Sequence, residues 1–298
     1  MSDILSEIGL AFLLAPYNIA IALFNPGAWL AWGDKTALAR FIYYGASVEF
    51  FFAIFFIFAV ITVIGLFRSS FLWGAVRVTE TIGNWVGRTF AWVGLLMVLQ
   101  QVMIVFLQRI FRTGEISLGP FGINFTRDIS WWAEELKLYN AAIVCLCVSY
   151  TFIQGGHVRV DLVYSAVKFR TKKVIDMLGC FLFMLPAITI TYLYAWFFMW
   201  RHLVVPGPAA SMDLERIMRG AAVMRWNVET IGFSPNGFDA YFLFKILIVG
   251  FCVLVYIQAW SFFWRSLLEF REGEASSGKY LDKDTLGDEE AELAADIH

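Results

Sequence analysis

Five polar side chains stand inside long apolar runs of this 298-residue sequence and are the first candidates for chemistry. Glu49 lies about 12 Å along one run, where its carboxylate could bind a cation or a proton, or pair with a neighbouring helix. Lys245 lies about 10 Å into another run, and its long side chain could instead reach the membrane surface. Gln100, Gln101 and Asn140 are typical of hydrogen bonds between membrane helices. For Glu49 and Lys245, functional and structural roles both stay open.

The three histidines bear on whether the chain binds haem. A haem held by two histidines needs both imidazoles at one depth on facing helices. His157 precedes an apolar run and His202 follows the same run, so they are predicted on opposite sides of a membrane, and His298 ends the chain. No Ser-His-Asp set, zinc motif or phosphate-binding glycine loop is found. The sequence therefore predicts neither an active site nor a cofactor, although His202 could contact a partner.

The composition is that of an integral membrane protein. Hydrophobic residues make up 59% of the chain, charged residues 16%, and the mean hydropathy is +0.67. The apolar residues form long runs separated by short polar stretches, without the alternation of barrel strands. Since backbone groups inside a bilayer must be satisfied within the segment, the runs are expected to be helices. We predict an all-α integral membrane protein surrounded by lipid, with no nucleic-acid partner.

About six membrane-spanning helices are predicted, with two complications. The runs cover residues 8–32, 41–67, 90–107, 133–153, 174–200 and 238–264. Pro16 and Pro26 lie in the first run, so its helix is expected to be kinked or shorter than the run. Residues 68–89 carry one apolar stripe among charged residues, which predicts a separate amphipathic helix on the membrane surface.

The basic residues predict how the chain is oriented. Their densest group lies between the fourth and fifth runs and comprises Arg159, Lys168, Arg170, Lys172 and Lys173. Short loops rich in Lys and Arg stay in the cytoplasm. Both termini and the 68–89 helix are then cytoplasmic, while 108–130 and 201–236 face outward, although the latter also carries four arginines. Residues 269–298 hold ten acidic and three basic residues and are predicted to be a disordered cytoplasmic tail.

Two short motifs flank the fourth run. Trp-Trp-Ala-Glu-Glu-Leu at 131–136 opens it and contains Trp131, Trp132, Glu134 and Glu135. Gly-Gly-His-Val-Arg-Val-Asp-Leu at 155–162 closes it and contains His157, Arg159 and Asp161. Both glutamates are expected in the first helical turn, where carboxylates interact favourably with the helix dipole. With Ser-Pro-Asn at 234–236 and the run that carries Lys245, these motifs resemble the small membrane subunit of tripartite ATP-independent periplasmic (TRAP) transporters, the Q subunit or DctQ family.

The resemblance implies a four-helix Q-subunit core over 90–268, preceded by two additional helices in 1–67. In this family the Q subunit lies in the bacterial inner membrane with both termini in the cytoplasm. It braces a large permease, the M subunit, which binds sodium and the substrate. It also helps to dock a periplasmic solute-binding protein, the P subunit, which delivers an organic acid anion. The residues that such subunit contacts would use are Trp131, Trp132, Glu134, Glu135, His157, Arg159, Asp161 and Lys245.

Two other functions fit the same hydrophobic pattern. One is a membrane anchor or quinone-linked subunit of a respiratory complex, which a haem absorption band would support. The other is a small carrier that works alone, although such carriers usually show two related halves and the chain shows no such symmetry. Co-purification with a large permease would instead support the Q subunit.

Overall fold

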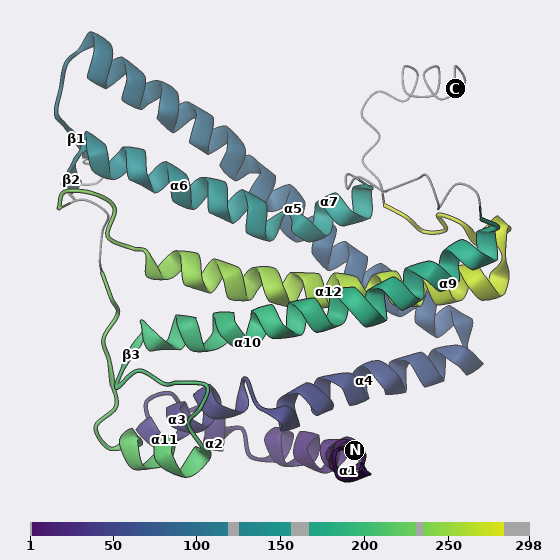
Figure 1. The fold of residues 1–298 in the computed structure, drawn as a ribbon. Coiled ribbons are helices and arrows are strands. Elements are labelled where there is room, and N and C mark those ends of the chain that lie inside the picture. Colours follow the sequence, from purple (N-terminus) through teal and green to yellow (C-terminus); the bar gives the residue numbers. More distant parts are fainter. Residues whose placement is uncertain (1, 119–124, 156–166, 231–234, 283–298) are drawn as a thin grey trace, which may run out of the picture.

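The computed structural model describes residues 2–118, 125–155, 167–230 and 235–282, and it is mostly helical. Its long helices form one elongated bundle (Figure 1), in which α12 (Phe242–Glu272) is central. Helix α12 packs against α5 (Ser69–Val105), α6 (Ile129–Leu146), α7 (Val148–Gln154), α9 (Phe169–Gly179) and α10 (Leu185–Arg201). Five helical segments are long and apolar enough to cross a membrane, or six if the bent pair of α6 and α7 counts as one.

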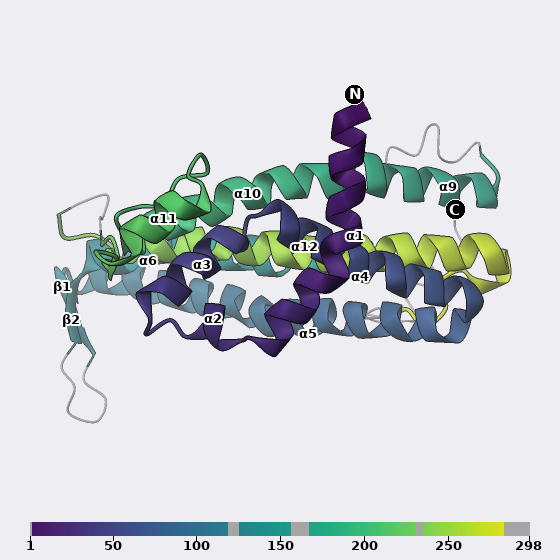
Figure 2. The same cartoon turned by 90° about the horizontal axis from the view of Figure 1, so that it is seen from below.

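The first helix, α1 (Ser2–Phe24), runs across the other long helices instead of alongside them. It is seen end-on in Figure 1 and crosses the bundle in Figure 2, where it rests on α4 (Val48–Phe67). The apolar run continues to residue 32, but α1 stops earlier because Pro26 disfavours helix at the residue before it. The short helix α2 (Gly27–Leu30) follows. The start of α1 lies beside the middle of the bundle (Figure 2), and the cytoplasmic location of the N-terminus stays a prediction.

The second predicted run, 41–67, is two helices rather than one. Helix α3 (Lys35–Tyr44) ends before Gly45, and α4 begins after Ser47, whose hydroxyl accepts a backbone hydrogen bond from the first turn. A serine in this position is a strong N-cap because it satisfies an amide that has no helical partner. Glu49 therefore lies exposed in the first turn of α4. Its predicted place deep inside a membrane helix is wrong.

Helix α5 is continuous over 37 residues and ends in a π-helical turn, η1 (Phe106–Ile110). The predicted division into a surface helix at 68–89 and a membrane helix at 90–107 is therefore wrong. The apolar stripe, with Leu72 and Val76 fully buried, packs against α4 and α12 rather than against a bilayer surface. A stripe of this kind predicts a buried face, but it does not say whether lipid or protein covers it.

A short pair of strands and several bent or interrupted helices follow α5. Strands β1 (Glu115–Leu118) and β2 (Phe125–Asp128) pair antiparallel within 108–130, the segment predicted to face outward. Helices α6 and α7 meet with a bend of 46° and together form the fourth predicted run. Gly155, with φ of 77°, ends α7 in a left-handed conformation that suits glycine. Helix α9 continues through a π-helical turn, η3 (Cys180–Met184), into α10.

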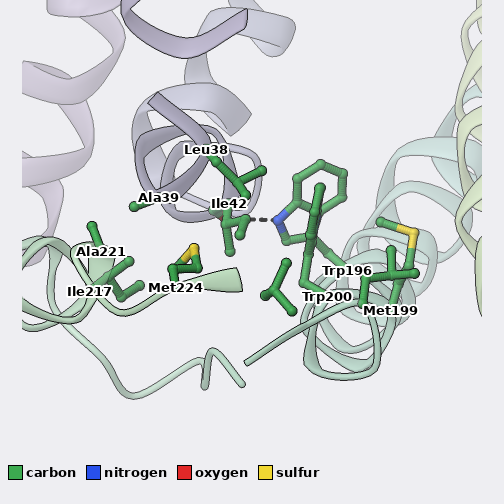
Figure 3. Packing of buried hydrophobic residues seen from close by; sticks show 11 residues of the cluster. Leu38, Ala39, Ile42, Trp196, Met199, Trp200, Ile217, Ala221 and Met224 are labelled. Carbon is green, nitrogen blue, oxygen red and sulfur yellow. Dashed lines mark hydrogen bonds between the residues drawn. The ribbon is translucent and has the colours of Figure 1, made fainter. Parts of the chain in front are cut away.

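Residues 201–230 close one end of the bundle (Figure 1). Strand β3 (Val204–Val205) pairs with β4 (Arg225–Trp226), and α11 (Leu214–Ala221) lies between them in the sequence. One buried cluster joins α3, α10 and α11 (Figure 3) and comprises Leu38, Ala39, Ile42, Trp196, Met199, Trp200, Leu203, Val204, Ile217, Ala221 and Met224. Trp196 Nε1 donates to Ile42 O at 2.9 Å. The contact is close because Gly45 has no side chain; a Cβ there would lie 2.1 Å from the Trp196 ring.

Acidification is expected to loosen the start of α3. The Asp34 carboxylate caps α3, and hydrogen bonds from the Thr36 hydroxyl and amide lower the pKa of Asp34. A lowered pKa in the folded state means that the cap stabilises α3 above the unfolded pKa of about 4 and is lost as pH falls below it. Hydrogen exchange over 35–44, corrected for intrinsic rates, should lose protection in acid. Asp34→Asn, which caps without titrating, should remove this pH dependence; an unchanged pH dependence would contradict the assignment.

The acidic C-terminal tail begins as ordered structure. Helix α12 extends to Glu272, and a 3-10 turn, η4 (Glu274–Ser276), follows it. Glu269 is 3% exposed, and residues up to 282 return along the bundle. The prediction of disorder is therefore wrong for 269–282, while 283–298 lie outside the described residues.

Candidate functional site

A buried ionic network joins α5, α9 and α12 at one end of the bundle. Glu80 of α5, only 4% exposed, accepts hydrogen bonds from Arg265 Nε at 2.8 Å and Nη2 at 2.6 Å, and one from Ser261 Oγ at 3.3 Å. Such a two-point contact between guanidinium and carboxylate fixes both the distance and the angle between α5 and α12.

A second carboxylate extends this network to α9. Glu269 lies 2.6 Å from Lys173 Nζ and 3.7 Å from Arg265 Nη1, and it accepts the amide of Gly278 at 3.2 Å. Lys173 also lies 3.8 Å from Asp176 on its own helix. We call Glu80, Lys173, Arg265 and Glu269 the ionic network. Its charges are paired with one another, as buried charges must be if the fold is to tolerate them.

The segment that follows α12, up to Asp282, contacts the same end of the bundle. Asp282 receives two hydrogen bonds from the Arg88 guanidinium, at 2.9 and 3.0 Å. Its backbone carbonyl accepts from Asn84 Nδ2 at 2.9 Å and from Gln154 Nε2 at 3.1 Å. Arg265 reaches the same segment by donating to Lys279 O at 2.9 Å. The segment thus connects α5, α7 and α12.

The motif at 131–136 lies at the opposite end of the bundle and contacts the segment that precedes α12. Trp131 Nε1 donates to Asp239 Oδ1 at 3.2 Å, and Glu134 Oε2 accepts the amide of Phe238 at 2.9 Å. Trp132 is buried among neighbouring aromatic rings. These contacts hold the segment before α12 against α6.

The two glutamates are not in the first helical turn as predicted, because α6 begins at Ile129. Their role is that of hydrogen-bond acceptors. Glu135 Oε2 accepts from Gln100 Nε2 at 3.1 Å, and Gln100 also donates to Trp132 O at 3.1 Å, which links α5 to α6. The other two amides expected between helices, Gln101 and Asn140, are exposed.

Removal of the Glu134 carboxylate is expected to free the segment before α12. A hydrogen bond to a charged acceptor contributes about 1.5–3 kcal/mol. In Glu134→Ala, the amide of Phe238 should therefore exchange at least about tenfold faster, since about 1.4 kcal/mol is a factor of ten. Glu49→Ala, at an exposed glutamate, is the matched control and should leave this segment unchanged. Equal exchange in the two variants would contradict the role given to Glu134.

Lys245 belongs to a small polar cluster with Glu229 and His202. Helix α12 begins at Phe242, so Lys245 lies in its first turn rather than deep inside the helix as predicted. Its ammonium is 3.8 Å from Glu229 Oε2 and 4.9 Å from the centre of the Phe198 ring. His202 Nε2 is 3.0 Å from the same carboxylate oxygen, and His202 Nδ1 is 2.7 Å from Phe198 O. Both ring nitrogens of His202 therefore lie within hydrogen-bond distance of oxygen atoms of the same chain.

The ionic network was not predicted from the sequence, and at the opposite end of the bundle only the motif at 131–136 and Gln100 were predicted. Glu80 follows Leu72 and Val76 at intervals of four residues on the buried stripe, a signal that could have marked it as a buried carboxylate. Its partner Arg265 lies 185 residues away, which spacing alone cannot reveal. Of the residues predicted for subunit contact, His157, Arg159 and Asp161 lie outside the described part of the chain.

The arrangement holds helices of the chain together at both ends of the bundle. Over residues 2–118, 125–155, 167–230 and 235–282, no group of three or more His, Cys, Asp and Glu side chains has the geometry of a metal site. The polar clusters at both ends contact neighbouring helices of the same chain. Comparison with protein-family models, curated proteins and solved structures finds no match to this chain.

Proposed function

We propose that the chain is a noncatalytic membrane subunit that braces a larger permease, as the Q subunit does in TRAP transporters. The observation that carries the proposal is the ionic network, which links three long helices, α5, α9 and α12, through paired buried charges. A network of this kind restrains the movement of one helix against another. A rigid frame is what a moving permease requires of a fixed partner subunit.

The outer surface of the bundle supports a place in the membrane. In the 18-residue apolar window of each candidate membrane helix, between 6% and 22% of the residues are buried inside the chain. Many large apolar side chains of these helices are exposed, among them Leu13, Val63, Trp92 and Phe183. In water such a surface would drive association, whereas lipid and apolar protein surfaces cover it. A bundle of this kind suits a subunit that contacts both lipid and another membrane protein.

The distribution of charge supports an orientation. Lys168, Arg170, Lys172 and Lys173 lie at the start of α9, at the same end as the ionic network (Figure 1). By the positive-inside rule this end faces the cytoplasm of a bacterial inner membrane, together with the described C-terminal segment. The hairpin of β1 and β2, and α11, then face the periplasm. There they are placed to meet a solute-binding protein that delivers an organic acid anion.

The resemblance to the Q subunit and the contacts of His202 favour this function over a subunit of a respiratory complex. Of the parts that carry the resemblance, the structure describes the motif at 131–136 and the run with Lys245 in full. His202 is paired with Glu229 and Phe198 O. On this proposal sodium and substrate bind to the partner permease, and the chain itself holds no cofactor.

Purification of the tagged chain from its native membranes tests the proposal. A large multi-span permease should be recovered with it in a fixed ratio, and the preparation should carry no haem absorption band. Recovery of oxidoreductase subunits, or a haem band, would show that the respiratory alternative is correct.

A further inference from the structure

The carboxylate of Glu229 connects side chains from the end of α10 and the start of α12. His202 directly follows α10, and its Nε2 lies 3.0 Å from Glu229 Oε2. The ammonium of Lys245, in the first turn of α12, lies 3.8 Å from the same oxygen. The end of α10 and the start of α12 lie at the same end of the bundle (Figure 1). One carboxylate thus contacts a basic side chain from each of two helix ends.

Main-chain hydrogen bonds place Glu229 beside His202. The amide of Glu229 donates to His202 O at 2.9 Å, and the amide of Asn227 donates to Leu203 O at 3.0 Å. With the pairing of β3 and β4, these bonds lay residues 225–229 along 202–205. The two titratable side chains are therefore neighbours, and a change of charge on the imidazole acts directly on residues 227–229.

Both ring nitrogens of His202 face oxygen atoms that accept hydrogen bonds. Nδ1 lies 2.7 Å from Phe198 O, and Nε2 faces the Glu229 carboxylate. A backbone carbonyl and an ionised carboxylate can only accept, so each oxygen requires an N–H from the ring. A neutral imidazole has one N–H and satisfies one of the two oxygens, whereas an imidazolium satisfies both. Its positive charge is also favourable at the C-terminal end of α10.

Few other charges surround this pair. Lys245 forms an ion pair with Glu229 only when the carboxylate is ionised, so the proton of the pair is assigned to the ring. On the elements that pack against this end, Lys35 of α3 donates to a backbone carbonyl, and Arg201 and Arg225 are exposed. Among the residues that the structure describes, none of these three forms an ion pair with Glu229.

We propose that His202 and Glu229 form a proton-binding site that makes the contact between α10, residues 227–229 and α12 sensitive to pH. When His202 is charged, both oxygens that face its ring are satisfied. When it is neutral, one of the two hydrogen bonds is lost. The contact with the charged ring holds one more proton, so it is favoured in acid and lost as pH rises through the range of about 5 to 8 in which histidines titrate. The inference concerns contacts within the chain and does not depend on the proposed function.

Hydrogen exchange of the purified full-length chain between about pH 5 and 8 tests the site. After correction for intrinsic rates, the backbone amides of Asn227 and Glu229 should lose protection about three- to tenfold as pH rises, as expected for a partly exposed ion pair. In Glu229→Gln this loss should vanish, because a side-chain amide can accept from Nε2 or donate to it and pairs with either form of the ring. Glu215→Gln, at an exposed glutamate of α11, is the matched control and should keep the pH dependence.

Nitrogen-15 NMR of the histidine rings follows the proton itself. The signals that disappear in His202→Gln identify this ring in the spectrum. In acid both of its nitrogens should carry a proton, and one proton should be lost over the same pH range as the protection of the two amides. Protection that does not change with pH in the parent chain would overturn the proposal. So would a pH dependence that survives in Glu229→Gln, or a ring that titrates in a different range from the loss of protection.

Discussion

Replacing Arg265 with methionine is expected to destabilise the bundle by about 3–5 kcal/mol, because it leaves the buried Glu80 carboxylate without its main partner. The two groups are joined by hydrogen bonds of 2.6 and 2.8 Å. Arg265 also donates to Lys279 O, so the C-terminal segment should loosen as well. Chemical or thermal unfolding of the purified chain in detergent measures the loss.

An exposed ion pair provides the control for this prediction. Arg88 and Asp282 have side chains that are 41% and 57% exposed, so Arg88→Met should cost at most about 1 kcal/mol. A double variant, Glu80→Leu with Arg265→Met, should recover most of the stability, because it removes the unpaired carboxylate. If Arg265→Met were as stable as Arg88→Met, the ionic network would not brace the helices.

The second large effect is expected at Gly87, where α5 and α7 approach closely. A Cβ at this position would lie 2.1 Å from Tyr150 Cβ, and both atoms are attached directly to backbone. Gly87→Ala should therefore push the two helices apart and cost about 1–3 kcal/mol.

Gly74, on the same helix, is the matched control. A Cβ there would meet no atom within 4 Å. Gly74→Ala should stabilise α5 by about 0.5–1 kcal/mol, because alanine loses less backbone freedom than glycine on folding. Unfolding measurements on the two variants should therefore differ in sign. A stabilising effect at both positions would contradict the packing of α5 against α7.

The long apolar helices and the early end of the first one could be predicted from the sequence, but the break at 45–47 and the continuity of α5 could not. An apolar run indicates that a segment is covered by lipid or by protein. It does not indicate which distant part of the chain covers it. Whether 68–89 lies on a membrane or against α4 and α12 depends on partners far along the chain, which is why the pattern predicts two helices where α5 is one. The break between Tyr44 and Val48 is likewise hidden, because glycine and serine occur inside membrane helices as well as between them.

At the candidate sites, too, the residues could be predicted from the sequence but their partners could not. Trp131, Glu134, Glu135 and Gln100 do lie together, but they contact one another and the segment before α12. The sequence marks them as polar or aromatic residues at a helix end, without specifying their partners. The direction of α1 could not be predicted at all, because length and hydropathy are the same for a helix that runs along a bundle and one that crosses it.

On the proposed function, the chain supports transport by a partner permease and does not transport by itself. The direct measurement is sodium-driven uptake of a labelled dicarboxylate or 2-oxo acid into proteoliposomes, with the solute-binding protein added outside. Vesicles that contain the co-purified permease and this chain should accumulate the anion, and vesicles with either one alone should not. Uptake by the chain alone, or equal uptake by the permease without it, would contradict the account.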